Sequence, residues 1–168
     1  MSLRLPRAYN EGMGFSGFTA ALFLVEPCYL SLLAEEEDDG CRGRALLVED
    51  CPVDRQVAER VLRRLGYRVV TVKTAEDAIS ESARRSFDLI LMDCRLPGLS
   101  GYRAAAEIRD LEAVSKSDRT PIVGVSASTS VRVESKCQRS GMDAFLEKPI
   151  SERLLRRALL SSGLAQDL

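Results

Sequence analysis

Five charged or hydroxyl-bearing residues lie at or just beyond the ends of short apolar runs in the sequence: Glu49, Asp50, Asp93, Ser126 and Lys148. Three carboxylates held within a few ångströms repel one another, and a hard divalent cation relieves that repulsion. Mg²⁺ fits best, because it binds through one or two carboxylates and keeps positions for water and phosphate. An aspartate beside Mg²⁺ can attack phosphorus, and an ammonium can pair with the transferred group. The residue types therefore predict phosphoryl chemistry, provided that the fold brings them together.

The apolar runs that precede these residues have the length and composition of buried strands. They occupy residues 45–48, 67–72, 87–92, 121–125 and 144–146. Amphipathic segments alternate with them, which predicts an α/β fold with a parallel sheet covered on both faces. In such sheets the functional crevice lies beyond the carboxyl ends of the strands. The polar residues that end the strands should therefore share one edge.

The intervening helices are predicted from apolar spacing and from capping residues. Val57, Val61 and Leu65 recur at i, i+4 and i+8, which is typical of an amphipathic helix. Thr74 and Ser100 can each cap the start of a helix, and the second of these helices has Ile108 and Leu111 on its apolar side. The segment 129–140 is predicted to be a weakly amphipathic helix. A closing helix is indicated by its apolar residues Leu154, Leu155, Ala158 and Leu159.

Composition excludes several classes of protein. The chain of 168 residues has a net charge of −1 and no histidine, so histidine-based catalysis and histidine metal ligands are excluded. Its five cysteines are odd in number and form no C-x-x-C, which disfavours a disulfide framework or a zinc site. We expect reduced thiols and a cytoplasmic setting, with no attraction to nucleic acid from the overall charge.

Residues 1–43 differ in composition from the rest of the chain. Their apolar stretch is interrupted at Glu26-Pro27 and is too short for a transmembrane helix, and no convincing signal-peptide cleavage pattern follows it. We expect a poorly ordered or loosely docked extension, with a docking helix or a membrane-touching segment as the alternative. The main domain is predicted over residues 44–162, followed by a short tail at 163–168.

Four segments, in this order, resemble the receiver domains of response regulators: residues 46–50, 87–98, 121–127 and 141–150. The resemblance covers residues 44–162 and is strongest to receivers of hybrid histidine kinases. It implies a flavodoxin-like, doubly wound five-stranded sheet of order 2-1-3-4-5 with five helices. The sequence departs from the family where Ser100-Gly101 replaces a frequent Asp-Gly, and serine still caps a helix.

The resemblance implies a role for each site residue. Asp93 would be the phospho-acceptor, Asp50 a direct Mg²⁺ ligand, Glu49 a ligand through water and the Arg95 carbonyl a further ligand. Ser126 and Lys148 would contact the phosphoryl oxygens. Phe145 would be an aromatic switch that turns inward with Ser126, and the Lys148–Pro149 bond would be cis. The Arg95 side chain would tune hydrolysis of the acyl phosphate or simply lie in solvent.

The implied partner is a histidine kinase or a histidine phosphotransfer protein. Phosphorylation would change the surface of the fourth helix, the fifth strand and the fifth helix, where a downstream protein or a second copy of the chain would bind. The domain would be no enzyme beyond Mg²⁺-dependent self-phosphorylation and slow autodephosphorylation. It would stand alone or form part of a longer kinase.

Three other functions are compatible with this fold. A pseudo-receiver that binds proteins without phosphorylation is the strongest alternative. An aspartate-based phosphatase commonly has a second aspartate where this chain has Arg95, and a flavin or nucleotide binder needs a glycine-, serine- or threonine-rich first loop. Cys51 and Cys94 each follow a key carboxylate; we interpret them as packing residues, with a redox gate as the alternative.

Overall fold

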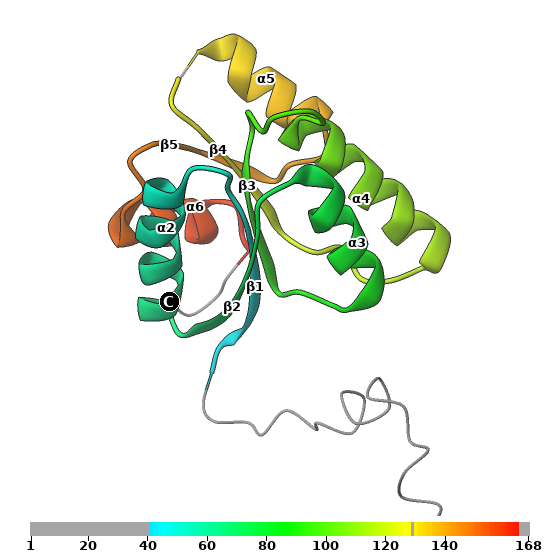
Figure 1. Ribbon diagram of the computed structural model, residues 1–168, viewed down its shortest axis with the longest axis horizontal. Coiled ribbons are helices and arrows are strands. Elements are labelled where there is room, and N and C mark those ends of the chain that lie inside the picture. The colour runs from blue at the N-terminus through cyan, green and yellow to red at the C-terminus, as the bar shows by residue number, and fades with distance from the viewer. Residues whose placement is uncertain (1–40, 129, 165–168) are drawn as a thin grey trace, which may run out of the picture. The chain divides into compact units, whose positions relative to one another are not determined.

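The computed structural model describes residues 41–128 and 130–164. Strands and helices alternate along this part of the chain (Figure 1). In chain order they are β1 (Gly43–Val48), α2 (Pro52–Arg64), β2 (Tyr67–Val72), α3 (Ala75–Arg84), β3 (Leu89–Asp93), α4 (Gly101–Ser115), β4 (Ile122–Ser126), α5 (Val131–Arg139), β5 (Ala144–Glu147) and α6 (Glu152–Ser161). The predicted alternation of strands and helices is confirmed.

The five strands form one parallel sheet in the order β2-β1-β3-β4-β5. The chain moves outward from β1 to β2, and then crosses to β3 on the other side of β1. The crevice of a doubly wound sheet lies at this reversal. The predicted flavodoxin-like order is confirmed, and it puts the ends of β1 and β3 side by side.

Each face of the sheet is covered by its own set of helices (Figure 1). Leu47, Leu89 and Leu91 pack with α2 and α6 on one face. Leu46 and Ile90 pack with α3, α4 and the single buried residue of α5 on the other. Because both faces are covered, β3 and β4 are buried along their whole length, as in other parallel sheets.

Hydroxyl side chains cap four of the five described helices. The oxygens of Thr74, Ser100, Ser130 and Ser151 accept hydrogen bonds from backbone N–H groups of the first turn. Pro52 instead stands in the first turn of α2, where its missing N–H costs nothing. The predicted caps at Thr74 and Ser100 are thereby confirmed.

The apolar stripe predicted for α2 is partly wrong. Val57 is 43% exposed, whereas Ala58, Val61 and Leu62 face the core. The buried face is centred one position further along the helix, because small Ala58 fits against the sheet and leaves Val57 beside solvent. Leu111 of α4 is also more exposed than its spacing with Ile108 predicts.

Several segment boundaries differ from the sequence predictions. Phe87 and Asp88 precede β3, and Asp93 and Ser126 are the last residues of β3 and β4 rather than the residues after them. The predicted extension lies outside the described residues except for residues 41–43, as do residues 165–168 of the tail.

Between residues 41 and 164, residue 129 apart, no helix is long and apolar enough to cross a membrane.

Candidate functional site

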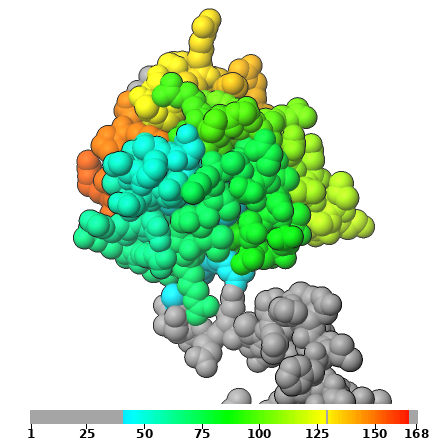
Figure 2. Space-filling model, in the orientation of Figure 1, coloured from blue at the N-terminus to red at the C-terminus, as the bar shows by residue number. Residues whose placement is uncertain are grey.

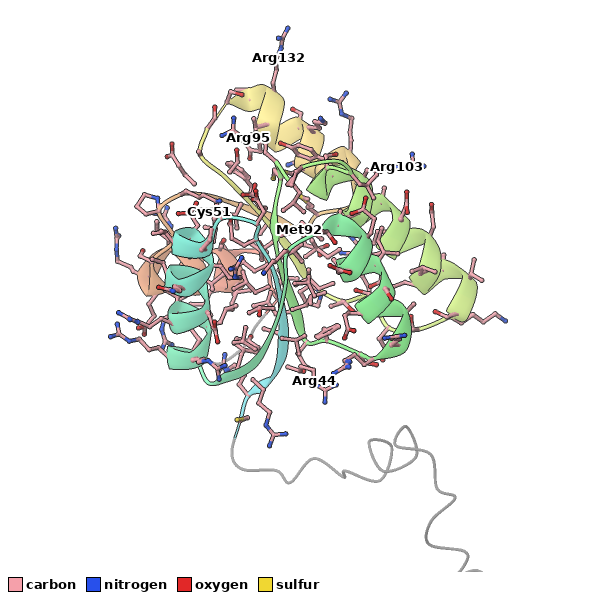
Figure 3. All side chains as sticks on the ribbon, in the orientation of Figure 1. Arg44, Cys51, Met92, Arg95, Arg103 and Arg132 are labelled. Atoms are coloured by element: carbon pink, nitrogen blue, oxygen red, sulfur yellow. The ribbon has the colours of Figure 1, made fainter. Side chains whose placement is uncertain are left out.

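The carboxyl ends of β1, β3, β4 and β5 bring the predicted residues together. Cys51, which follows the β1 carboxylates, and Arg95, which follows Asp93, lie toward one end of the sheet, and Arg44 at the start of β1 lies toward the other (Figure 3). Carboxylate oxygens of Glu49, Asp50 and Asp93 all lie within 4.8 Å of one another. The predicted convergence of charged residues is therefore present.

Lys148 is the cation at the centre of this cluster. Its Nζ donates hydrogen bonds to Asp93 Oδ2 at 2.6 Å, to Glu49 Oε2 at 2.7 Å and to Asp54 Oδ2 at 2.9 Å. Burial alone would lower the pKa of Lys148, but the three carboxylate partners outweigh it and raise this pKa above its ordinary value. The lysine therefore stays charged throughout the neutral range.

Glu49 is the most deeply buried acid of the cluster, with 2% of its surface exposed. Burial raises its pKa, although the hydrogen bond from Lys148 acts in the opposite direction and nearby Asp93 adds to the rise. The Cys51 N–H donates a further hydrogen bond to Glu49 Oε1 at 3.2 Å. A further cation beside Glu49 would oppose this rise, because positive charge favours the ionised carboxylate.

Asp50 is exposed, and its carboxylate completes the set of three acids that could hold a metal ion. Arg55, one turn into α2, donates hydrogen bonds to the backbone carbonyls of Glu49 at 3.0 Å and Asp50 at 3.2 Å. These bonds fix the backbone of the turn after β1. The two acids are thus presented from a restrained segment.

Ser126 closes the site on the β4 side and is 1% exposed. Its hydroxyl oxygen accepts a hydrogen bond from the Ser128 N–H at 3.3 Å, and its carbonyl accepts one from the Lys148 N–H at 2.9 Å. The Lys148–Pro149 bond is cis, as the resemblance implied. The serine and the lysine are therefore linked through the backbone.

Residues 45–160 match the family model of the response regulator receiver domain. The chain belongs to this family. It is 37% identical over 123 residues to the sensor protein GacS of Pseudomonas syringae pv. syringae, a match that covers 73% of this chain and 14% of GacS. It is 39% identical over 119 residues to the sensor histidine kinase AruS of Pseudomonas aeruginosa, covering 70% of this chain and 12% of AruS. The chain thus spans a small part of the curated relatives it matches.

Solved structures of receiver domains have the same fold. The receiver domain of sensor histidine kinase PA1611 from Pseudomonas aeruginosa PAO1, which has a magnesium ion in its active site cleft, matches with a TM-score of 0.63 and 40% identity, over 72% of this chain and 98% of that chain. The receiver domain of the Arabidopsis thaliana histidine kinase CKI1, in complex with Mg²⁺ and BeF₃⁻, matches with a TM-score of 0.66 and 28% identity, over 74% and 92%.

Arg95 contacts the acid cluster through its backbone and not through its side chain. Its N–H donates a hydrogen bond to Asp93 Oδ1 at 2.7 Å, while its side chain is exposed. Figure 3 shows that side chain on the side of the domain where α5 lies. Asp93 therefore has one oxygen held by Lys148 and the other by the Arg95 backbone.

Phe145 is half-buried and packs against the core beneath α3, α4 and α5. It pairs with Gly124 across the β4–β5 ladder and lines a groove of about 680 Å³ between α5, β5 and α6. Next to the groove, α5 buries Cys137 alone among its residues, all of which are described. The Phe145 side chain therefore lies between the groove and the hydrophobic core on the α3, α4 and α5 face of the sheet.

Sequence reasoning missed Asp54, the third carboxylate on Lys148. Asp54 lies in the first turn of α2, and its side chain is 44% exposed. The signal available was an acid four residues after Asp50, on the first turn of the helix that follows a strand-end acid. First-turn acids also stabilise helices by themselves, so this signal does not single out a site residue.

Gly101 is the second residue whose role sequence reasoning missed. A Cβ at this position would collide with the backbone carbonyl of Asp93 and press on Met92. The start of α4 consequently packs directly against the backbone that carries Asp93. Glycine is required here by close approach rather than by a special backbone angle.

Proposed function

We propose that this receiver domain accepts a phosphoryl group on Asp93 from a phosphohistidine and thereby switches a protein-binding surface. The observation that carries the proposal is the shared contact of one ammonium, Lys148 Nζ, with Asp93 and Glu49 beside Asp50. Phosphohistidine is the donor expected because the chain resembles parts of sensor histidine kinases, and the donor's histidine is one that this chain lacks. A histidine kinase or a histidine phosphotransfer protein would supply it.

In the transfer step, an Asp93 carboxylate oxygen forms a bond to phosphorus while the bond between phosphorus and the imidazole nitrogen breaks. The released imidazole nitrogen keeps its electron pair and takes a proton from solvent. Lys148 then pairs with a phosphoryl oxygen, and the Ser126 hydroxyl donates a hydrogen bond to another. Lys148 Nζ lies 2.6 Å from Asp93 Oδ2, and Ser126 is the last residue of β4, the strand that pairs with β3.

The acids of the site fit a magnesium ion. Glu49, Asp50 and Asp93 provide oxygen ligands, and together with Asp54 these four carboxylates outnumber the Lys148 cation that neutralises them. Glu49, Asp50, Asp93 and the Arg95 carbonyl would hold the ion, with Glu49 acting through water. When bound, Mg²⁺ would supply positive charge beside the transferring phosphoryl oxygens.

Phosphorylation would act on the surface formed by α5, β5 and α6. A negatively charged group on Asp93 draws Ser126 and Lys148 toward it, and Phe145 turns into the space left beside β4. The groove beside Phe145 then changes shape, which alters what a downstream protein or a second copy of the chain can bind. Water slowly hydrolyses the acyl phosphate and resets the site. The setting we propose is the cytoplasm.

The decisive experiment is phosphorylation by a small phosphodonor with Mg²⁺, read on a phosphate-retarding gel. Wild type should shift, and Asp93→Asn or a metal chelator should abolish the shift. Asp54→Asn is the matched control, because it removes another carboxylate from the same lysine and should keep the shift. A folded wild-type protein that binds Mg²⁺ but never shifts would instead be a pseudo-receiver that binds partners without phosphorylation.

A further inference from the structure

Three sulfur atoms meet under the phospho-acceptor strand, in space that a glycine leaves open. A Cβ on Gly124 would lie 2.6 Å from Met142 Sδ, 3.2 Å from Cys137 Sγ and 3.3 Å from Cys94 Sγ. The two cysteine sulfurs are 3.7 Å apart, and both cysteines are buried. Gly124 is thus what allows the residue after β3 and a residue of α5 to touch across β4.

The two cysteines belong to elements that are otherwise weakly connected. Cys94 follows Asp93 directly, and its N–H is bonded to the Val125 carbonyl at 2.8 Å, so its position is fixed by the sheet. Cys137 is the buried residue of α5, a helix that leaves Val131 81% exposed. Figure 2 shows the yellow atoms of α5 at the surface, at the upper end of the domain. The sulfur contact therefore joins α5 to the residue that follows β3.

We propose that Cys94 and Cys137 form a reversible disulfide when the protein meets a peroxide, and that this bond fixes α5 to the acceptor strand. During a local opening of α5 that exposes its thiol, Cys137 would take an oxygen atom from hydrogen peroxide to give a sulfenic acid and one water. The Cys94 thiol would then attack that sulfur, forming the S–S bond and releasing a second water. Thiols such as glutathione would reverse the bond by exchange.

The geometry requires only a modest movement. Bonded sulfurs are about 2.05 Å apart, so the two atoms must approach by about 1.6 Å from their 3.7 Å contact. Rotation about the Cα–Cβ bonds and a small shift of α5 toward β4 would have to supply that distance. Met142, which borders the same space, has a flexible thioether that can repack around the new bond.

Besides the sulfur contact with Cys94, the same part of α5 has a non-covalent contact with α4. Lys136 Nζ lies 4.1 Å from the centre of the Tyr102 ring, an attractive arrangement of a cation over an aromatic face. A disulfide at the next residue, Cys137, would add a covalent tie at the same place. The oxidised form would therefore hold α5 against β4 and α4 by a covalent bond, whereas the reduced form has only the non-covalent contacts.

The test uses the full chain, reduced and then treated with hydrogen peroxide. Remaining thiols are alkylated, and tryptic peptides are mapped by mass spectrometry without reductant. The expected product joins residues 86–95 to residues 137–139, has lost two hydrogen atoms, and separates on reduction. Cys51 lies on a third peptide, residues 45–55, and serves as the internal control. Free, alkylated Cys94 and Cys137 after oxidation, or a cross-link of either to another cysteine instead, would overturn the proposal.

Hydrogen exchange tests whether the bond restrains α5. Amides of residues 131–139 should exchange several-fold more slowly in oxidised than in reduced wild type, and Cys137→Ser should remove this difference. Cys51→Ser is the matched control and should leave it unchanged. A disulfide that forms without slowing exchange in α5 would refute the restraint. Because neither readout uses phosphorylation, the result does not depend on the function proposed for Asp93.

Discussion

The Lys148 ammonium and the Asp93 carboxylate are in direct contact, with Nζ 2.6 Å from Oδ2. The lysine also bonds Glu49 and Asp54, so its position is determined by several acids rather than by the acceptor alone. A phosphoryl group on Asp93 would therefore meet a cation that is already in place. The same cation offsets part of the negative charge of the three acids that it contacts.

Replacement of Lys148 by methionine should destabilise the domain in the absence of metal. The change leaves the buried carboxylates without their shared cation, and we expect a loss of about 1–3 kcal/mol of unfolding free energy, less than for a fully buried pair because the lysine is 15% exposed. Added Mg²⁺ should restore more stability than it adds to wild type. Denaturant unfolding with and without Mg²⁺ measures both effects.

Lys148→Arg is the control for that experiment, since it keeps the charge and should lose less stability than the methionine variant. If Lys148→Met unfolds at the same denaturant concentration as wild type, the lysine does not balance the charge of these acids, and Glu49 must be protonated in the metal-free domain.

Gly101→Ala should destabilise the domain by about 2–4 kcal/mol, because the new Cβ would collide with the Asp93 carbonyl and force α4 away from β3. Gly98→Ala is a matched comparison, three residues earlier in the loop that precedes α4. Its nearest heavy atom would be 3.9 Å away, and its φ of +73° costs only about 1 kcal/mol for alanine. Thermal or denaturant unfolding of both variants provides the measurement, and equal losses would contradict the role of Gly101.

The sequence could predict the site because a parallel sheet brings the carboxyl ends of its strands to one edge. Asp93 and Ser126 follow uninterrupted apolar runs, and such runs become strands buried on both faces. The positions of Glu49 and Lys148 follow from the same rule. The order of strands and polar residues along the chain was therefore enough to predict that these residues lie close together, without any knowledge of side-chain conformation.

The contacts that sequence reasoning missed depend on how helices pack rather than on where strands end. Asp54 reaches Lys148, which is 94 positions away, only because α2 lies against the sheet with its first turn facing the site. Cys94 and Cys137, 43 positions apart, meet because Gly124 has no side chain between them. The exposure of Val57 has a similar origin, since Ala58 and not Val57 faces the sheet. Periodicity predicts that a helix has a buried face, but it places that face only to within about one residue.

Arg109 should contribute far more to stability than Arg119, although both contact the same carboxylate. Each guanidinium lies 2.7 Å from an Asp143 oxygen, but the side chain of Arg109 is 12% exposed and that of Arg119 is 57% exposed. Arg109 also bonds the carbonyls of Gly141 and Thr120.

We expect Arg109→Ala to cost about 2–4 kcal/mol, because the part-buried Thr120 carbonyl and Glu112 carboxylate lose this partner and Asp143 loses its less exposed arginine. Arg119→Ala should cost less than about 1 kcal/mol, as for other exposed ion pairs. Urea unfolding of the two variants compares them directly, and similar losses would mean that the network is effectively solvated.

Mg²⁺ should stabilise the domain more at neutral than at acidic pH, because Glu49 must lose its proton to contribute to the site. Burial raises the pKa of Glu49 above its ordinary value of 4.5. In the metal-free domain, a raised pKa stabilises the fold while the group is protonated, so that contribution is present below about pH 4.5 and is lost as the pH rises through the folded-state pKa. Ionisation of Glu49 then provides the negative charge that a cation can use.

The Tm increase produced by Mg²⁺, measured at about pH 5 and about pH 7.5, should therefore be larger at the higher value. Glu49→Gln removes the titrating group while it keeps the size of the side chain, so its Tm increase should be smaller and should depend less on pH. An equal Mg²⁺ effect at both pH values in wild type would show that Glu49 is ionised throughout this range, and that Lys148 rather than burial dominates its pKa.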